Sequence, residues 1–154
     1  MIEEWDIPDD QYHRAGKENY FKEKHAANEA ELKKIIEEKF GVTLEKLTNK
    51  YTADFLAFRF GRAVALIEVK ERTFEMGRFP TALLALDKVL NGLYISEPMS
   101  IPYMYFCKWT DQLAYVELTR EYYQTTQIQK KDFRNDKQDI QPSIYIPIAN
   151  FNLI

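Results

Sequence analysis

Hydrophobic side chains recur with a helical period between residues 17 and 40. Leu32, Ile36 and Phe40 lie four positions apart, and the segment contains neither glycine nor proline. This period predicts an amphipathic helix, which Gly41 is well suited to end.

Two apolar runs after this helix predict a β-hairpin. Residues 51–60 and 63–70 are rich in β-branched and aromatic side chains, and Gly61-Arg62 between them provides the turn. The second run is apolar on both faces, so we expect it in the centre of a sheet.

A second helix is predicted over residues 81–95, with Pro80 at its start. Leucine side chains form its inner face, and Lys88 points away from the core. The leucines are Leu83, Leu86, Leu90 and Leu93.

Further strands are predicted toward the C-terminus. Residues 103–109 and 112–118 form a second strand pair joined at Thr110-Asp111. Residues 143–151 also have a strand-like pattern, and we expect Pro147 to place that strand at a sheet edge.

The order of these elements is helix, strand, strand, helix, strand, strand. It predicts an α/β (α+β) fold built on a single mixed β-sheet flanked by helices. A chain of 154 residues is long enough for one domain with a core. Within it we expect an N-terminal arm (1–16), a core (17–118) and a C-terminal extension (119–154) that contains the edge strand.

Composition and charge restrict the classes of protein to which this chain can belong. Hydrophobic residues make up 45% and charged residues 29% of the chain, as in folded soluble proteins. The single cysteine, Cys107, cannot form an internal disulfide, the acidic N-terminus is unlike a signal peptide, and no apolar run is long enough to cross a membrane. We therefore expect an intracellular, cytoplasmic protein with no membrane partner. A net charge of −3 argues against nucleic-acid binding through bulk positive charge but leaves room for a local basic surface.

Few side chains are candidates for chemistry. The chain lacks a glycine-rich phosphate loop and a Gly-x-Ser-x-Gly motif, and two histidines with one cysteine cannot form a usual zinc site. Glu68 and Lys70 are two positions apart in a predicted strand, so both lie on one face. Such a pair at the end of an apolar strand is costly to bury unless something compensates it. The alternative is that the strand ends there and both groups reach water.

Asp54 in the preceding strand joins this pair only in one register of the hairpin. It shares the face of Glu68 if the two residues pair, which requires a loop over residues 60–62 or a bulge near Asp54. A two-residue turn alone would direct Asp54 to the other face. In the favourable register the two carboxylates and the backbone carbonyl of Val69 can surround Mg²⁺, for which Mn²⁺ would substitute. Lys70 would then orient a water or stabilise developing negative charge, which suits hydrolysis of a phosphodiester.

This pattern resembles that of the PD-(D/E)XK nuclease superfamily. Asp54 is followed 14 positions later by Glu68-Val69-Lys70, and the resemblance covers residues 17–118. Ala53 stands where many members have a proline. The resemblance implies a restriction-endonuclease-like core, Asp54 and Glu68 as metal ligands, Lys70 as the catalytic lysine, and DNA as the substrate. Among small members the chain looks most like structure-selective enzymes such as Holliday-junction resolvases, which act as dimers; a DNA exonuclease is the alternative.

Many members of that superfamily take a further acidic residue from the first helix. On a helical projection Glu29 faces inward, and we expect it to be a third metal ligand, or alternatively the buried partner of Lys70 or of an arginine. His25, one turn earlier on the same side, either assists in catalysis or makes an ordinary hydrogen bond in the core.

A nuclease also needs cations that position DNA phosphates. The candidates follow the motif, lie on the second helix or cluster in the tail: Arg72, Arg78, Lys88, Lys130, Lys131 and Arg134, with Lys137 nearby. Each is also compatible with an ordinary solvated surface.

Two classes of function therefore stand. The first is a Mg²⁺-dependent DNA nuclease that acts as a homodimer. The second is a noncatalytic interaction or assembly module with the same fold, whose acidic arm and Trp5 bind another protein. The complete set of Asp54, Glu68 and Lys70 favours the enzyme.

Overall fold

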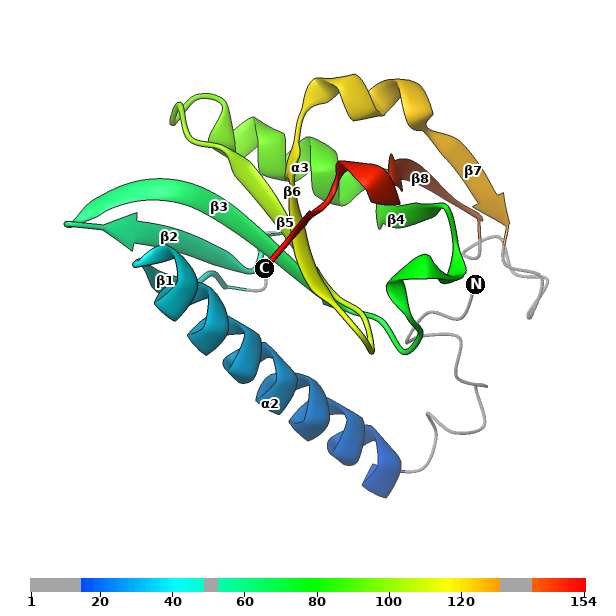
Figure 1. Cartoon of the computed structure of the whole chain (residues 1–154), viewed down its shortest axis with the longest axis horizontal. Helices are drawn as coiled ribbons and strands as arrows, with labels where there is room; N and C mark the ends of the chain where they lie inside the picture. Colours follow the sequence, from blue (N-terminus) through cyan, green and yellow to red (C-terminus); the bar gives the residue numbers. More distant parts are fainter. Residues whose placement is uncertain (1–14, 49–52, 131–139) are drawn as a thin grey trace.

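The computed structural model describes residues 15–48, 53–130 and 140–154, and the side chains of these residues except 15–27, 129–130 and 140–141. Two sheets and two α-helices dominate this part of the chain (Figure 1). The helices are α2 (Ala15–Phe40) and α3 (Leu86–Ser96). The strands are β1 (Thr43–Lys46), β2 (Phe55–Arg59), β3 (Arg62–Glu71), β4 (Thr81–Ala85), β5 (Tyr103–Lys108), β6 (Leu113–Leu118), β7 (Gln127–Lys130), β8 (Ile140–Pro147) and β9 (Asn152–Leu153). Short 3₁₀ helices lie at Met76–Arg78, Arg120–Thr125 and Ile148–Asn150.

The larger sheet separates two hydrophobic cores. Its strands are ordered β1-β2-β3-β5-β6-β9, with β3 and β5 as parallel neighbours at the centre. α2 packs on one face through Ile36, and α3 packs on the other through Val89. The mixed α/β class predicted from the sequence is therefore confirmed, and β3 is the central strand that its two apolar faces predict.

A second, smaller sheet lies on the α3 side of the molecule, so the described residues form two sheets where the sequence predicts one. Its three strands are ordered β4-β8-β7. β8 is the middle strand, so the prediction that Pro147 marks an edge strand is wrong. Pro147 ends β8 beyond the residues that pair with β7, so its missing N–H leaves that ladder intact.

α2 confirms the predicted first helix and its end. Gly41 follows Phe40 with a φ of 63° and donates its N–H to the carbonyl of Glu37 at 3.0 Å. Glycine adopts this left-handed conformation at little cost. Leu32 and Ile36, on the predicted inner face, are buried.

The β2–β3 hairpin turns one residue earlier than predicted. Phe60 and Gly61 form a two-residue turn, with φ values of 51° and 75°. Positive φ at both positions is the pattern of the turns that fit the twist of a hairpin. Phe60 is 97% exposed at the tip of the hairpin.

A bulge in β3 changes the register that this turn would impose. Val64 is the extra residue, because Phe58 pairs with Ala63 and Ala57 with Ala65, and beyond it Phe55 pairs with Ile67. Continued by one residue, this register sets Asp54 opposite Glu68. Of the two predicted ways to reach that arrangement, the bulge is confirmed and the three-residue loop is wrong.

Residues 81–85 form strand β4, so the prediction of one helix over residues 81–95 is wrong for its first part. Alanine and leucine favour helices, but the whole segment pairs with β8, from Thr81 opposite Pro147 to Ala85 opposite Ser143. Tertiary pairing therefore overrides local propensity.

The buried face of α3 also differs from the predicted leucine face. It consists of Val89, Gly92, Leu93 and Ser96. Leu90 is 45% exposed, contrary to the prediction. A methyl group at Gly92 would overlap the ring of Tyr103, so a small residue sets how closely α3 approaches β5.

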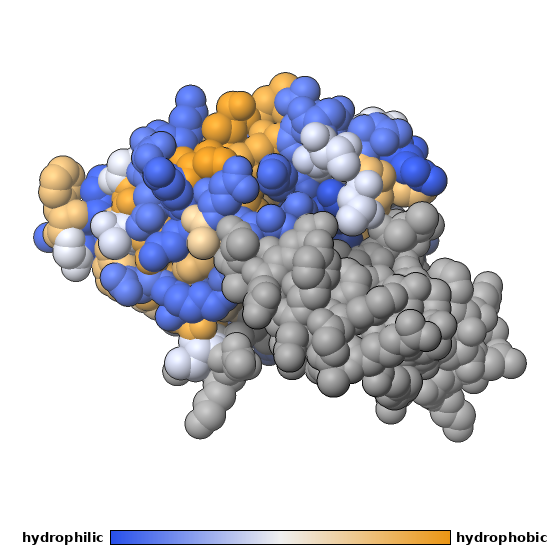
Figure 2. Space-filling model, turned by 90° about the horizontal axis from the view of Figure 1, so that it is seen from below, coloured by the Kyte–Doolittle hydropathy of each residue, from blue (hydrophilic) through white to orange (hydrophobic). Residues whose placement is uncertain are grey.

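Hydrophilic side chains predominate on the described surface seen from below, with hydrophobic ones gathered in smaller areas (Figure 2). Tyr94 on α3 is 83% exposed and lies, like Phe60, outside both cores.

Within the described ranges, none of the helices has the length and apolar character needed to cross a membrane.

Candidate active site

A pocket of about 140 Å³ opens where β3 ends, between α2 and α3. Side chains from four parts of the chain line it: Asn28, Glu29 and Leu32 of α2, Asp54 before β2, Val69, Lys70 and Glu71 of β3, and Lys88 of α3. Several of the residues singled out in the sequence thus meet at one place, which we take as the candidate active site.

Asp54 is held at this pocket by hydrogen bonds to β3 and to Leu47, the residue that follows β1. Its Oδ2 accepts the N–H of Val69 at 2.8 Å, and its own N–H donates to the carbonyl of Ile67 at 3.0 Å. The carbonyl of Asp54 accepts the N–H of Leu47 at 2.9 Å. The half-buried carboxylate is therefore fixed to the end of β3.

Glu68 is completely buried beneath the pocket, with an exposed fraction of 0%. It lies opposite Tyr105 of β5, on the face that α3 covers. One carboxylate oxygen, Oε1, accepts a hydrogen bond from Nζ of Lys88 at 2.7 Å. The other, Oε2, is buried without a hydrogen-bond partner.

The surroundings of Glu68 oppose its negative charge. Burial, followed by the nearby charge of Asp54, raises the pKa of Glu68 to about 8, although Lys88 opposes the shift. This coupling places the two carboxylates next to each other, as the hairpin register predicts. A buried pair of like charges is a common feature of functional sites.

Lys88 faces this carboxylate, so the prediction that it points away from the core is wrong. Its side chain is 40% exposed and reaches inward from the first turn of α3 to Glu68. Burial lowers the pKa of Lys88, but the charges of Glu68 and Asp54 outweigh it and raise the pKa above its ordinary value. Lys88 is therefore a cation at neutral pH.

Lys70 lines the pocket beside Asp54 and is partly buried. Alternation along β3 places it on the face of Glu68. Its position agrees with the geometry expected from the sequence, and its catalytic role stays a prediction.

Glu29 lies at the edge of the pocket and forms an ion pair with Lys46 of β1. The alternative expectation, that Glu29 pairs with Lys70 or with an arginine, stays a prediction. The expectation that Glu29 binds a metal stays a prediction, and the side chain of His25 lies outside the described ones.

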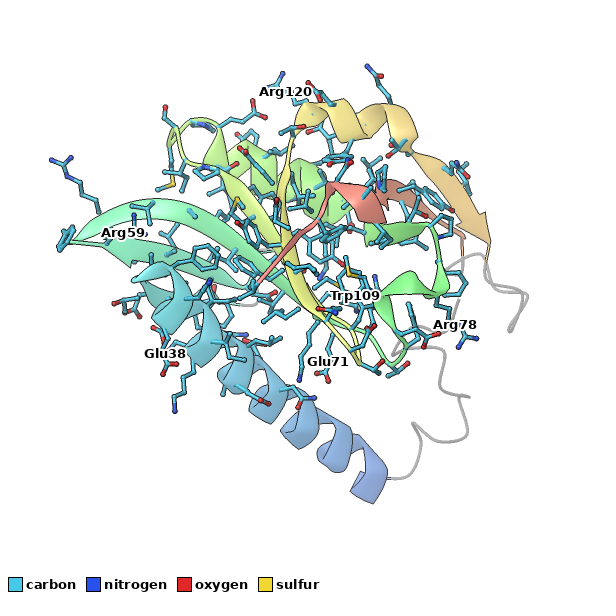
Figure 3. The ribbon with its side chains drawn as sticks, viewed as in Figure 1. Glu38, Arg59, Glu71, Arg78, Trp109 and Arg120 are labelled. Carbon is cyan, nitrogen blue, oxygen red and sulfur yellow. The ribbon has the colours of Figure 1, made fainter. Side chains whose placement is uncertain are left out.

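Glu71 was missed by the sequence reasoning although it lines the same pocket. It lies at the end of β3 (Figure 3), and its Oε2 is buried without a hydrogen-bond partner. The available signal was its position directly after Lys70. Strand alternation alone places it on the opposite face, but the pocket reaches around the end of the strand.

Comparison with known proteins identifies the family. A family model described as "Phage putative PDDEXK endonuclease" matches residues 16–154. The chain belongs to this PDDEXK endonuclease family. The resemblance carried by Asp54, Glu68 and Lys70 is therefore confirmed.

No curated protein matches this chain. Among solved structures it is similar to Archaeoglobus fulgidus Hjc, a Holliday junction resolvase from an archaeal hyperthermophile. The two share 17% sequence identity with a TM-score of 0.47, over 75% of this chain and 87% of the other.

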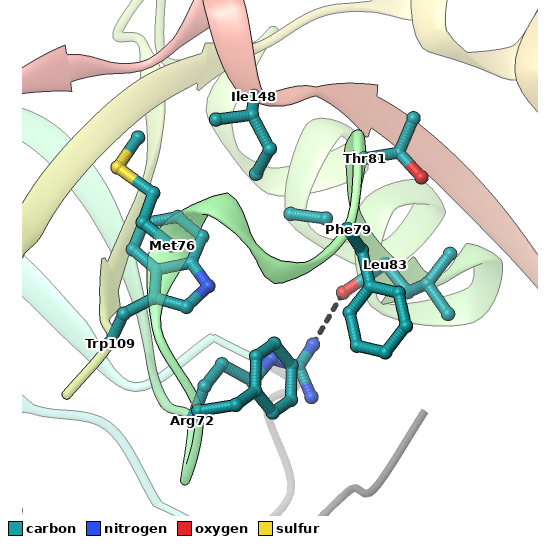
Figure 4. A pocket seen from close by; sticks show the side chains of 9 residues that line it. Arg72, Met76, Phe79, Thr81, Leu83, Trp109 and Ile148 are labelled. Carbon is teal, nitrogen blue, oxygen red and sulfur yellow. Dashed lines mark hydrogen bonds between the residues drawn. The ribbon is translucent and has the colours of Figure 1, made fainter.

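The side chain of Arg72, which the sequence predicts to contact DNA, lies inside the protein. It is 5% exposed, and its Nη2 donates to the carbonyl of Leu83 at 2.7 Å (Figure 4). This bond ties the end of β3 to β4. The predicted phosphate contact is wrong, since a buried guanidinium has no surface to offer to DNA.

The other predicted DNA contacts are exposed, have no described side chain or lie outside the described residues. Arg78 is exposed, with its guanidinium 5.6 Å from the ring centroid of Phe79. Lys130 ends β7, but its side chain is not among those described. Lys131 and Arg134 lie outside the described residues, as does Lys137. A phosphate contact by any of these residues stays a prediction.

The chemistry of the pocket fits a hard divalent cation. Within the described ranges, no group of three or more histidine, cysteine, aspartate or glutamate side chains converges on one metal position. Asp54 and Glu68 do come together, and the unpaired Oε2 of Glu68 is a buried oxygen that a cation would satisfy. Because Mg²⁺ retains several waters when bound to protein, two carboxylates are compatible with such an ion at this pocket.

Proposed function

We propose that this protein is a metal-dependent DNA endonuclease that hydrolyses phosphodiester bonds. Its active site in this proposal consists of Asp54, Glu68 and Lys70. The observation that carries the proposal is that Asp54, whose Oδ2 accepts the N–H of Val69, lies beside Glu68, whose Oε2 is buried without a hydrogen-bond partner. Membership of the PDDEXK endonuclease family supports the same chemistry.

Each residue has a distinct proposed role. Asp54 and Glu68 hold a divalent cation, with the carbonyl of Val69 as a further oxygen donor and Glu29 at the edge of the pocket. A bound Mg²⁺ or Mn²⁺ lowers the pKa of a water and offsets negative charge on the phosphate. Lys70 orients the attacking water or stabilises the charge that develops on the phosphate oxygens.

In this proposal cationic side chains hold the phosphates of the DNA. Arg78 is exposed and available for a phosphate, and the tail contributes Lys130, Lys131 and Arg134. Three further parts of the proposal rest on the sequence alone. They are a preference for four-way junctions, a homodimer, and the docking of a partner protein by the acidic arm.

Covalently closed circular DNA tests the endonuclease directly, because an exonuclease needs a free end. With Mg²⁺ or Mn²⁺ we expect nicked or linear product, and with EDTA we expect none. A four-way junction and a linear duplex of matched sequence test the structural preference in the same assay. A protein that is inert on all these substrates with either metal would instead be the noncatalytic module.

Substitutions locate the site. Asp54→Asn, Glu68→Gln and Lys70→Met should each lower the cleavage rate by about 100-fold or more, while the melting temperature is held or rises. Glu45→Gln and Lys34→Met make matched changes at exposed positions and should cleave like the wild type. Wild-type rates in the three site variants would place the reaction elsewhere on the molecule.

A further inference from the structure

The two oxygens of the Glu68 carboxylate have different surroundings. Nζ of Lys88 donates to Oε1 at 2.7 Å, whereas Oε2 has no hydrogen-bond partner. Both lie in a side chain that is completely buried. One oxygen is therefore held by the protein, and the other is left for a ligand.

Lys88 occupies a position that its own helix does not favour. It is the third residue of α3, where the helix dipole disfavours a cation and favours an anion such as the neighbouring Asp87. A residue that breaks a local rule requires a compensating interaction, and such residues occur most often at functional sites. The contact with Glu68 provides that interaction.

The backbone at Lys88 is held in place by packing of the next residue and by a hydrogen bond. Val89, the next residue, is completely buried, and the carbonyl of Lys88 accepts the hydroxyl of Tyr103 at 3.4 Å. The direction from which Nζ approaches Glu68 is thus set by the packing of α3 on β5.

We propose that Lys88 is a positioning residue, which holds the Glu68 carboxylate so that Oε2 is presented to the catalytic metal. This inference rests on the proposed metal site. Hydrogen-bond partners of ligating carboxylates orient them, and their loss typically weakens metal binding by about 10- to 100-fold.

Metal binding by the full-length, DNA-free protein tests this role independently of activity. Titration calorimetry with MnCl₂ gives the dissociation constant. Lys88→Met keeps an extended side chain without the donor and should raise the dissociation constant about 10- to 100-fold, while Lys88→Arg should restore it to within about threefold of the wild type. Lys34→Met makes the same change on an exposed helical position and should have no effect.

Other outcomes overturn the proposal. Unchanged Mn²⁺ binding in Lys88→Met would mean that the lysine serves only DNA binding or stability. Tighter binding would mean that its charge merely repels the ion. In the background of Glu68→Gln, Lys88→Met should have no further effect, and an additive loss would contradict the mechanism. If Lys88→Met does not fold, Lys88→Gln, which is shorter and neutral, replaces it in the same titration. Weaker Mn²⁺ binding by this variant supports the proposal, and unchanged binding contradicts it.

Failure of the proposed metal site has a separate signature. If Asp54→Asn binds Mn²⁺ like the wild type, the site is misplaced and both proposals fall. If Asp54→Asn loses Mn²⁺ while Lys88→Met retains it, only the role of Lys88 is wrong.

Discussion

Glu68 dominates the electrostatics of the pocket because its carboxylate is buried beside a second carboxylate. Burial and the charge of Asp54 raise its pKa to about 8, although Lys88 lies in hydrogen-bond contact. The metal-free site therefore favours a proton on Glu68 at neutral pH. A divalent cation would replace that proton and favour the ionised carboxylate.

This shift predicts how stability depends on pH in the absence of metal. In the unfolded chain Glu68 loses its proton near its ordinary pKa of 4.5, whereas in the folded chain it retains the proton up to about pH 8. Between these values the folded state binds more protons, so its stability falls as the pH rises. We expect the melting temperature of the EDTA-treated wild type to fall more steeply than that of Glu68→Gln across this range. Parallel melting curves for the two proteins would contradict the burial of an ionisable group there.

Asp54 and Glu68 could be predicted from the sequence, but Glu71 and the surroundings of these carboxylates could not. Alternation in a strand predicts that Glu68 and Lys70 share a face, and pairing in the hairpin predicts the place of Asp54. The contact of Lys88 and the burial of Arg72 depend on how β4 and α3 pack. Those positions are set by strand β8 far downstream, which no local pattern contains.

At the scale of elements, the local pattern predicts the first helix and misjudges the second. In α2 the apolar residues Leu32 and Ile36, which the period places inward, are buried. α3 buries Gly92 and Ser96 and exposes Leu90, the reverse of what polarity suggests. Its inner face is chosen by close approach to Tyr103, and hydrophobic periodicity carries no information about such a fit.

The packing of α3 on β5 predicts a large effect of one methyl group. Gly92→Ala would overlap the Tyr103 ring, and relief requires a shift of α3 or of a fully buried tyrosine. We expect a loss of at least about 1–3 kcal/mol in the free energy of unfolding, measured by urea denaturation. Gly77→Ala is the matched control, because nothing lies within 4 Å of its added carbon. Similar losses in both variants would show that α3 adjusts easily.

At the scale of the whole molecule, the C-terminal segment is part of the main core and not an appendage. β8 contributes Ile144 and Ile146, both completely buried, to the core that contains Leu66 and Tyr105 of the large sheet. Phe151 packs edge-on against Trp109. The described part of residues 119–154 thus completes the layer that positions α3 and Lys88 over the site.

A shared core predicts that the two sheets unfold together. Ile146→Ala removes buried methyl groups from the small sheet and should lower the free energy of unfolding by about 2–5 kcal/mol. Fluorescence of buried Trp109, in a Trp5→Phe background, should report the same shift as far-ultraviolet circular dichroism, because one cooperative transition gives coincident midpoints. Ile128→Ala truncates a side chain that is 73% exposed in the same sheet and should change little. If Ile146→Ala separates the two signals, the small sheet unfolds on its own. Because β4 belongs to that sheet and would unfold with β8, the packing of α3 on β5 alone would then hold Lys88 in place.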